Sequence, residues 1–324
     1  MPRPTVTIIV VSYNTREAVR DCLRALARVR DEAELDVVVV DNASVDDTVG
    51  MIQAEFPCVR LISNHENRGF AAAVNQGASS TQSEFFLMLN PDTWISRGAL
   101  AKLLAVMAQD PRIAVVGAQL ASFRGDDQGS VLAPPTLPKE FFNLLPELKA
   151  ILVPAFLKRR LQRGRHVERR GQVEVPAVSG GAMLVRTGAF REAGGLDERF
   201  FVYHEEVDLC LRLAQQGWRI VFQPTAVVLH YDALATGFRT NRLPPEPVLS
   251  WRLRGTAVLF EKHTVAGTRD RFVRLACRLL RLRASLARWR GRWAAAGQAD
   301  WARRAEELEM AAVSLAAPRS GAEL

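Results

Sequence analysis

The alternation of strand-like and helix-like segments in the first eighty residues constrains the fold most strongly. Runs of β-branched residues predict buried strands, and a helical pattern follows each run. The predicted elements are strand 5–13, helix 14–30, strand 36–41, helix 44–53, strand 59–63 and helix 70–79. Ser44 and Asp47 are spaced as a capping box for the second helix. Short strand–helix links indicate an α/β, Rossmann-like, mostly parallel sheet flanked by helices.

Polar residues follow the ends of these predicted strands. Asp41 ends the second run, and Asn90-Pro91-Asp92 stops an apolar run at 85–89. Because Pro91 cannot continue the strand, Asp92 is expected at the open end of the sheet, where α/β proteins hold ligands. A carboxylate beside an amide oxygen suits a partly hydrated Mg²⁺ or Mn²⁺ that bridges phosphates. A plain turn is the alternative.

Six motifs occur in a fixed order between residues 5 and 232. They are Val11-Ser12-Tyr13-Asn14, Asp41-Asn42-Ala43-Ser44 with Asp46-Asp47, Asn67-Arg68-Gly69-Phe70, Asn90-Pro91-Asp92, Ser179-Gly180-Gly181 and Glu205-Glu206-Val207-Asp208-Leu209. This ordered set resembles the family 2 glycosyltransferases, in particular their bacterial rhamnosyltransferase-like branch. The resemblance implies a GT-A fold, a nucleotide-diphosphate sugar donor, a divalent metal (Mg²⁺ or Mn²⁺) and transfer with inversion at the anomeric carbon.

The residues expected to bind the donor lie in the first five motifs, except Asn75, which follows the third motif by five residues. They are Ser12, Tyr13, Asp41, Arg68, Asn75, Asn90, Gly180 and Gly181. Asp41 is placed to accept from a uracil or thymine imide while Tyr13 packs on the base, and Arg68, just before a helix, addresses the diphosphate. The alternatives are a turn at Asp41, a solvated Arg68 and an Asn75 that only satisfies neighbouring backbone. For the two glycines the alternative is a tight turn.

Asp92 and His230 are the predicted metal ligands. His230 ends a further apolar strand at 220–229, and the family often places a metal- or diphosphate-facing histidine there. A structural histidine is the alternative. The common family motif is Asp-x-Asp, whereas this chain has Asn90 in the first place, so metal affinity is expected to be lower. The Asn-Pro-Asp form is similar to that of the rhamnosyltransferase-like branch.

The second acidic cluster is predicted to carry the catalysis. An inverting transfer needs a base that takes the proton from the acceptor hydroxyl, and a carboxylate suits this role. The family pattern assigns the base to Glu206, where Asp is usual, with Glu205 as the alternative base. Two adjacent carboxylates raise at least one pKa. Asp208 is expected to orient the helix or an acceptor hydroxyl, and acids that only stabilise a helix start are the bland alternative.

Composition agrees with a folded enzyme in a reducing compartment. Hydrophobic residues make up 48% of the 324 positions, and the four cysteines have no metal-ligand spacing. No signal peptide and no apolar run of membrane-spanning length is recognised. We expect a cytoplasmic protein, with peripheral attachment to the inner face of the cell membrane as a further expectation.

Two regions stand apart from the predicted catalytic domain, which spans 1–235. Residues 120–175 resemble an acceptor-side insertion, with a surface loop as the alternative. The region 236–324 is predicted to be helical, basic and amphipathic, and it supplies much of the net charge of +8. Its apolar stripe is Phe272, Leu275, Leu279, Leu282, Leu286, Trp289 and Trp293, with arginines between. An anionic membrane surface is the favoured partner, with packing on the domain or a dimer seam as alternatives, and nucleic acid is not expected.

The expected function is inverting sugar transfer in the synthesis of cell-surface polysaccharide. The resemblance favours dTDP-rhamnose over a UDP-sugar as donor and a glycan or lipid-linked acceptor. The alternative is a catalytically inactive nucleotide-sugar-binding or membrane-adaptor protein of the same fold, because Asn90 and Glu206 replace aspartates of the family pattern.

Overall fold

The computed structural model describes residues 4–145, 171–231, 246–293 and 298–317. The chain divides into two compact units, which are described separately. The sheet unit comprises residues 1–134, 163–201 and 205–234, and the helical unit comprises 135–162, 202–204 and 235–324. The second unit thus takes residues from the middle of the chain as well as from its end. Most of the predicted insertion, at 146–170, lies outside the described residues.

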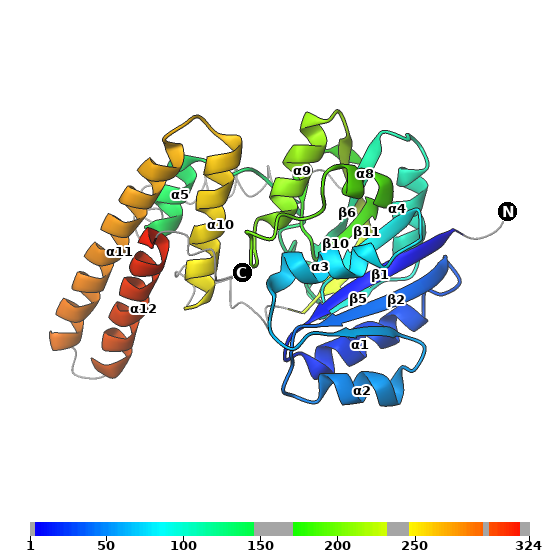
Figure 1. Ribbon diagram of the computed structural model, residues 1–324, viewed down its shortest axis with the longest axis horizontal. Coiled ribbons are helices and arrows are strands. Elements are labelled where there is room, and N and C mark those ends of the chain that lie inside the picture. The colour runs from blue at the N-terminus through cyan, green and yellow to red at the C-terminus, as the bar shows by residue number, and fades with distance from the viewer. Residues whose placement is uncertain (1–3, 146–170, 232–245, 294–297, 318–324) are drawn as a thin grey trace. The chain divides into compact units, whose positions relative to one another are not determined.

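The sheet unit is built on a nine-stranded sheet (Figure 1). Its strands run in the order β3 (Arg60–Ser63), β2 (Glu34–Asp41), β1 (Thr5–Ser12), β4 (Phe85–Leu89), β10 (Ala182–Arg186), β6 (Ile113–Ala121), β11 (Arg219–His230) and β5 (Thr93–Ile95), with β8 (Val173–Glu174) also beside β11. Neighbours are parallel except at β10, β5 and β8, which are antiparallel to the strands they contact. A small second sheet pairs β7 (Val131–Leu132) with β9 (Ala177–Val178). The predicted mostly parallel sheet is confirmed.

Helices cover both faces of this sheet (Figure 1). They are α1 (Arg16–Ala27), α2 (Thr48–Glu55), α3 (Gly69–Ser79), α4 (Ala99–Met107), α8 (Thr187–Glu192) and α9 (Glu205–Gln215). Ile8 shares one core with α1, α2 and α4, whereas Ile9 points to the other face, against Gly77 of α3. Successive residues of a strand face opposite sides. The strand β1 is therefore buried on both faces, which explains its unbroken apolar run.

The helix α2 begins later than its predicted capping box. The structure starts it at Thr48, and the side chain of Asp47 does not cap it. The carboxylate of Asp46 instead accepts hydrogen bonds from the backbone N–H of Thr48 and of Arg16. Ser44 is drawn away because its hydroxyl donates to Asp41. The predicted Ser44–Asp47 capping box is therefore wrong, since Ser44 binds Asp41 and Asn14, and Asp47 forms an ion pair with Arg16.

The helical unit packs four described helices around a core of its own (Figure 1). They are α5 (Leu137–Leu144), α10 (Val248–His263), α11 (Thr268–Trp293) and α12 (Gln298–Ala316). The rings of Phe260 and Phe272 lie 5.2 Å apart in this core. Alanines on the facing sides of α11 and α12, such as Ala284 and Ala312, are fully buried and allow close approach of the two helices. Among the described residues, no helix is long and apolar enough to cross a membrane.

Candidate active site

Strand pairing gathers several of the predicted site residues at one edge of the sheet. Ser12 and Asp41 end neighbouring parallel strands and are partners in register. The strand β4 ends beside them at Leu89, so Asn90 and Asp92 follow at the same edge. The parallel pair β6–β11 ends there too, because β10 is antiparallel to both β4 and β6. His230, the last residue of β11, therefore reaches this edge as well.

Asp92 and His230 come into direct contact. Because β5 is antiparallel to β11, Thr93 lies opposite His230, and the backbone N–H of Tyr231 donates to the carbonyl oxygen of Asp92. As a result, Oδ1 of Asp92 lies 3.2 Å from Nε2 of His230. Both side chains are largely buried. Within the described residues, Nδ1 of His230 has no hydrogen-bond partner.

The Asp92–His230 pair fits a divalent cation whose remaining ligands are water and substrate phosphates. Over the described parts of the chain, no group of three or more His, Cys, Asp or Glu residues is arranged to hold a metal. Mg²⁺ binds in many enzymes through one or two protein ligands, with water and substrate phosphates completing its shell. Asp92 and His230 supply that number, and the carboxylate supplies the charge.

The Gly180–Gly181 turn connects the strand-end motif with the second acidic cluster. The backbone N–H of Asn90 donates to the carbonyl oxygen of Gly181 at 3.0 Å. A Cβ added to Gly181 would lie 2.9 Å from a methyl of Leu120 and 3.4 Å from the amide nitrogen of Asn90. A Cβ on Gly180 would lie 3.7 Å from Cβ of Glu206. The two glycines therefore form a turn that has Glu206 next to Gly180 and the side chain of Asn90 next to Gly181.

Glu205 and Glu206 have different surroundings at the start of α9. Glu205 is only 4% exposed, and its Oε2 has no hydrogen-bond partner among the described residues. Burial, and then the charge of Glu206, raise the pKa of Glu205 well above its usual value. Glu206 is partly exposed. Burial thus favours the protonated form of Glu205.

Asp208 is committed to an ion pair within its own helix. Its carboxylate is fully buried and lies 2.8 Å from Nε of Arg212, four residues further on. The same guanidinium donates to the carbonyl oxygens of Ala193 and Gly195. Asp208 thus anchors a turn through Arg212, which favours the helix-orienting role. Arg212 was not singled out from the sequence, although the (i, i+4) spacing is a signal for such a pair.

Asn75 holds the next residues of that turn. Its side-chain amide donates to the carbonyl oxygen of Leu196 and accepts from the backbone N–H of the same residue, both at 2.9 Å. It also donates to Glu198. These bonds favour the alternative in which Asn75 satisfies backbone groups and does not contact the donor.

Asp41 is buried and begins a turn. Its carboxylate accepts from the backbone N–H of Ser44 at 2.9 Å and from the Ser44 hydroxyl at 2.6 Å. Asn14 binds the same loop through Ser44 and Val45. Tyr13 stands beside these loops with 49% of its surface exposed. The exposed ring is available for stacking, whereas Asp41 shares its oxygens with Ser44.

Arg68 is exposed directly before α3. The following Gly69 has a φ of +82°, and a Cβ there would lie 2.6 Å from the carbonyl oxygen of Phe201. Only glycine combines this conformation with so close an approach. The arginine is thereby set at the N-terminus of the helix, a position suited to anions.

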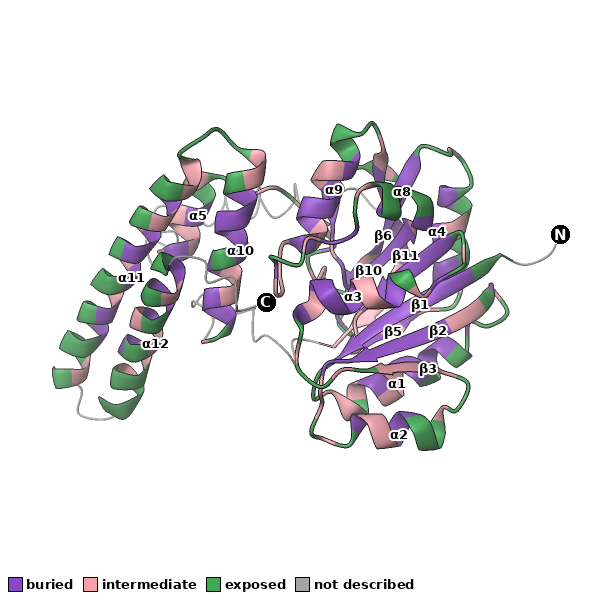
Figure 2. Ribbon diagram, viewed as in Figure 1, coloured by how far each residue is buried: buried purple, intermediate pink, exposed green. Residues whose placement is uncertain are grey.

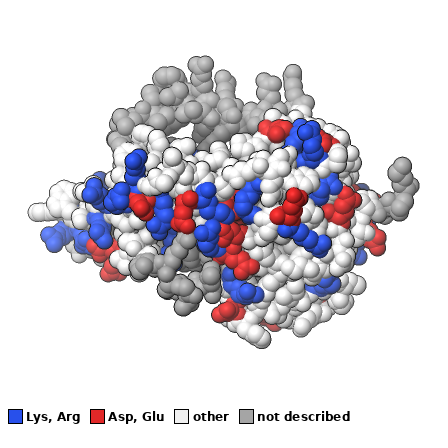
Figure 3. Space-filling model, turned by 45° about the horizontal axis from the view of Figure 1, so that its top comes forward, with Lys and Arg blue, Asp and Glu red and all other residues white. Residues whose placement is uncertain are grey.

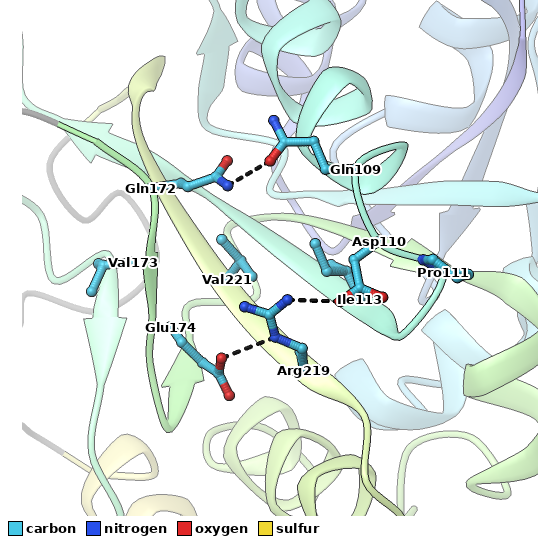
Figure 4. A pocket seen from close by; sticks show the side chains of 9 residues that line it. All are labelled: Gln109, Asp110, Pro111, Ile113, Gln172, Val173, Glu174, Arg219 and Val221. Carbon is cyan, nitrogen blue, oxygen red and sulfur yellow. Dashed lines mark hydrogen bonds and ion pairs between the residues drawn. The ribbon is translucent and has the colours of Figure 1, made fainter.

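A separate pocket of about 380 Å³ opens at the other edge of the sheet (Figure 4). It is lined by residues at the starts of β6 and β11, among them Asp110 and Arg219. Arg219 lies 2.8 Å from Asp110 and 3.0 Å from Glu174, and Gln172 donates to Gln109. Its charged groups bind one another. None of the predicted site residues lines it.

The chain matches the Glycosyl transferase family 2 over residues 7–193. It is 29% identical to the N-acetylglucosaminyl-diphospho-decaprenol L-rhamnosyltransferase of Mycobacterium tuberculosis over 71% of this chain and 77% of that protein. It is 24% identical to the rhamnosyltransferase WbbL of Escherichia coli K12 over 82% of this chain and 96% of that protein.

Solved structures resemble the chain in fold. The structure of GalNAc-T7 with UDP, GalNAc and Mn²⁺ matches with a TM-score of 0.60 at 16% identity, over 86% of this chain but only about half (51%) of that one. The mannosyltransferase PcManGT from Pyrobaculum calidifontis, in complex with GDP-Man and Mn²⁺, matches with a TM-score of 0.53 at 20% identity, over 97% of this chain and 87% of that one. Because the family match covers more than half of its 324 residues, this chain belongs to glycosyltransferase family 2, and it has the GT-A fold.

Proposed function

We propose that this glycosyltransferase moves rhamnose from dTDP-rhamnose to a lipid-linked glycan, with inversion at the anomeric carbon, in the synthesis of cell-surface polysaccharide. Two relatives of this chain are named rhamnosyltransferases. The match to the Escherichia coli relative covers 82% of this chain and 96% of that protein. The mycobacterial relative is named for N-acetylglucosaminyl-diphospho-decaprenol, in which a diphosphate links a sugar to a lipid. The observation that carries the proposal is the glycine turn next to both Glu206 and Asn90: a Cβ on Gly180 would lie 3.7 Å from Cβ of Glu206, and one on Gly181 would lie 3.4 Å from the amide nitrogen of Asn90. A carboxylate therefore lies next to the turn that contacts the strand-end motif.

Glu206 acts as the base in this proposal. Its carboxylate takes the proton of the acceptor hydroxyl, and the acceptor oxygen forms a bond to the anomeric carbon. The bond between that carbon and the diphosphate oxygen breaks, and its electron pair leaves on the diphosphate. Attack from the face opposite the leaving group inverts the configuration. Burial raises the pKa of Glu205 and favours its protonated form, which makes Glu205 the less suitable of the two glutamates to take this proton.

The donor diphosphate lies at the strand ends in this arrangement. Asp92 and His230 would hold Mg²⁺ or Mn²⁺ there. When bound, that cation supplies positive charge opposite the leaving diphosphate. Arg68, at the N-terminus of α3, adds a second positive charge. Tyr13 stacks on the thymine base, and Asp41 accepts from its imide N–H.

The acceptor places the reaction at the inner face of the cell membrane. A lipid-linked glycan keeps its lipid in the bilayer, so the enzyme works at that surface without a membrane-spanning helix among its described residues. All four cysteines are free thiols, and we place the protein in a reducing compartment, where thiols stay reduced.

A donor panel tests this proposal. The purified chain is incubated with Mn²⁺, a soluble analogue of a lipid-linked acceptor, and dTDP-rhamnose, UDP-sugars or GDP-mannose in turn. Glycosylated product should form with dTDP-rhamnose, and its anomeric configuration should be opposite to that of the donor. A preference for a UDP-sugar would overturn the rhamnosyl assignment. Donor binding without transfer to any acceptor would support the alternative, an inactive nucleotide-sugar-binding protein.

A further inference from the structure

The helix α11 has three faces, where the sequence indicates a single apolar stripe. One face is buried in the helical unit and consists of Phe272, Ala276, Cys277, Leu280, Ala284 and Ala287. Phe272, the first residue of the predicted stripe, belongs to this buried face. The later stripe residues lie on another side of the helix, although Leu279 is partly buried and still packs against the core of the helical unit. Figure 2 shows α11 with buried residues along one side and exposed residues along the other.

The second face is apolar and exposed. Leu282, Leu286, Trp289 and Trp293 are 55%, 47%, 59% and 77% exposed. Leu275 and Leu279 continue this line in a partly buried state. These six residues, here called the apolar stripe, recur every three or four positions and so share one side of the helix. A contiguous exposed apolar surface that ends in two tryptophans marks an interaction site.

The third face is basic. Arg274, Arg278, Arg281, Arg288 and Arg292, here called the arginine row, are all exposed. Each of these arginines immediately precedes a residue of the apolar stripe, so the row lies about 100° around the helix from it. No Asp or Glu occurs in α11 after Asp270. Within the described residues, Arg288 is the one member of the row with an ion pair, to Glu309 at 2.7 Å. Figure 3 shows Lys and Arg side chains at the left of the view, and also across its middle and right, with Asp and Glu side chains among them.

We propose that α11 docks on an anionic lipid surface, with the apolar stripe at the boundary between headgroups and acyl chains and the arginine row on the headgroups. Leucines beside tryptophans suit this boundary, because the indole ring is apolar with one polar N–H. Arginines reach lipid phosphates while their aliphatic stems stay on apolar surface. This deepens and rests on the proposed function, because it names the surface that would present a lipid-linked acceptor.

A second copy of the chain fits this surface less well. Antiparallel pairing of two apolar stripes would bring two arginine rows to the same side of the seam, with no acid in α11 beyond Asp270 to compensate them. Like charges in such a seam oppose association. An anionic bilayer compensates the row and covers the stripe at once.

Sedimentation with vesicles tests the docking in the absence of donor and acceptor. The full chain is mixed with phosphatidylcholine vesicles that contain or lack phosphatidylglycerol, at low and high salt. Binding should require phosphatidylglycerol and weaken with salt. The triple variant Arg274→Gln/Arg278→Gln/Arg281→Gln should lose roughly 100-fold in affinity for the anionic vesicles, from the attraction of each arginine to the surface. Trp289→Ser/Trp293→Ser should reduce binding at high salt as well, because it removes apolar area.

Two matched controls separate the α11 surface from general charge and hydrophobicity. Arg24→Gln/Arg97→Gln/Arg112→Gln makes the same charge change at exposed positions of the sheet unit. Val45→Ser/Val265→Ser removes other exposed apolar side chains. Both controls should bind like wild type, and circular dichroism confirms that every variant is folded. Equal loss in the control and the row variant would overturn the proposal, as would a wild-type protein that ignores anionic vesicles.

The remaining outcomes distinguish this inference from the proposed function. A dimer in solution that dissociates in Trp289→Ser/Trp293→Ser would assign the stripe to a second copy and overturn the membrane docking. Turnover on a soluble acceptor analogue should stay at the wild-type level in the row variant. If vesicle binding behaves as expected while no donor supports transfer, the docking stands and the proposed function fails.

Discussion

Replacing each glutamate of the adjacent pair by glutamine should give opposite phenotypes. Glu205 is 4% exposed, and burial together with the neighbouring charge raises its pKa well above the usual value. Glutamine is close in shape to the protonated acid that the fold prefers there, so Glu205→Gln should keep turnover near wild type. Glu206→Gln removes the proposed base. It should lower turnover by about 10² to 10⁴-fold while donor binding survives.

The raised pKa of Glu205 also predicts a pH dependence of stability. Above the unfolded-state pKa the unfolded chain gives up this proton, whereas the folded protein keeps it until the pH passes the raised folded pKa. The folded state then binds more protons than the unfolded state, so stability falls as pH rises through this window. One group can contribute a slope of about 1.4 kcal/mol per pH unit. Glu205→Gln removes this pH dependence of stability. The Tm of the variant should therefore rise relative to that of wild type by roughly 3–6 °C per pH unit between pH 5 and the folded pKa.

Thermal unfolding of both proteins across pH 5 to 8 measures this effect, and initial rates with saturating donor measure the catalytic one. A constant difference in Tm between Glu205→Gln and wild type at every pH would refute the burial argument. Should Glu205→Gln lose turnover while Glu206→Gln stays active, the base is Glu205 and the proposed roles are reversed.

Three further substitutions test other parts of the site. Asp92→Asn keeps the shape but removes the charge, so nucleotide titration in Mn²⁺ should show weaker donor binding; wild-type affinity would contradict the metal assignment. Asp208→Ala leaves Arg212 without its buried partner and should cost about 3–5 kcal/mol in urea unfolding. The double variant with Arg212→Met should recover part of that loss, and no recovery would argue against the ion pair. Gly69→Ala, with its Cβ 2.6 Å from the carbonyl oxygen of Phe201, should destabilise by about 1–3 kcal/mol, and an unchanged unfolding midpoint would contradict the close approach of these two backbone segments.

The strand ends could be predicted because parallel strands that are buried on both faces leave unbroken apolar runs. The predicted first strand at 5–13 corresponds to β1, Thr5–Ser12, and Asp41 ends β2 as expected. Pairings between distant segments left no such signal. The contact between Asp92 and His230 depends on β5 lying antiparallel beside β11, and β5 has only three residues. The sequence singled out Asp92 and His230 as candidate metal ligands, but it gave no geometric reason to expect contact between the two side chains.

Burial explains the remaining differences. The sequence shows two adjacent glutamates but not which of them the fold encloses, and this decides where the charge resides. Asn75 fits a donor site and a backbone clamp equally well until the turn at Leu196 is known. In α11, residues on the buried side and residues on the exposed apolar side both recur every three or four positions, so the spacing alone does not tell the two sides apart. Phe272 was therefore grouped with Trp293, from which the structure separates it.

The charge balance of the proposed site gives a physical reason for Asn90, one of the two departures from the family pattern. A nucleotide diphosphate brings negative charge to a sheet edge that already holds Asp92 and Glu206. Asn90 in place of an aspartate removes one negative charge there, and burial neutralises a second by favouring protonated Glu205. Asp41 shares its charge with two hydrogen bonds from Ser44. Under the proposed function, less positive charge is then needed to hold the donor, and a cation held by Asp92 and His230 together with Arg68 at a helix N-terminus would be sufficient. In this arrangement the asparagine lowers repulsion of the substrate, and it is compatible with an active enzyme.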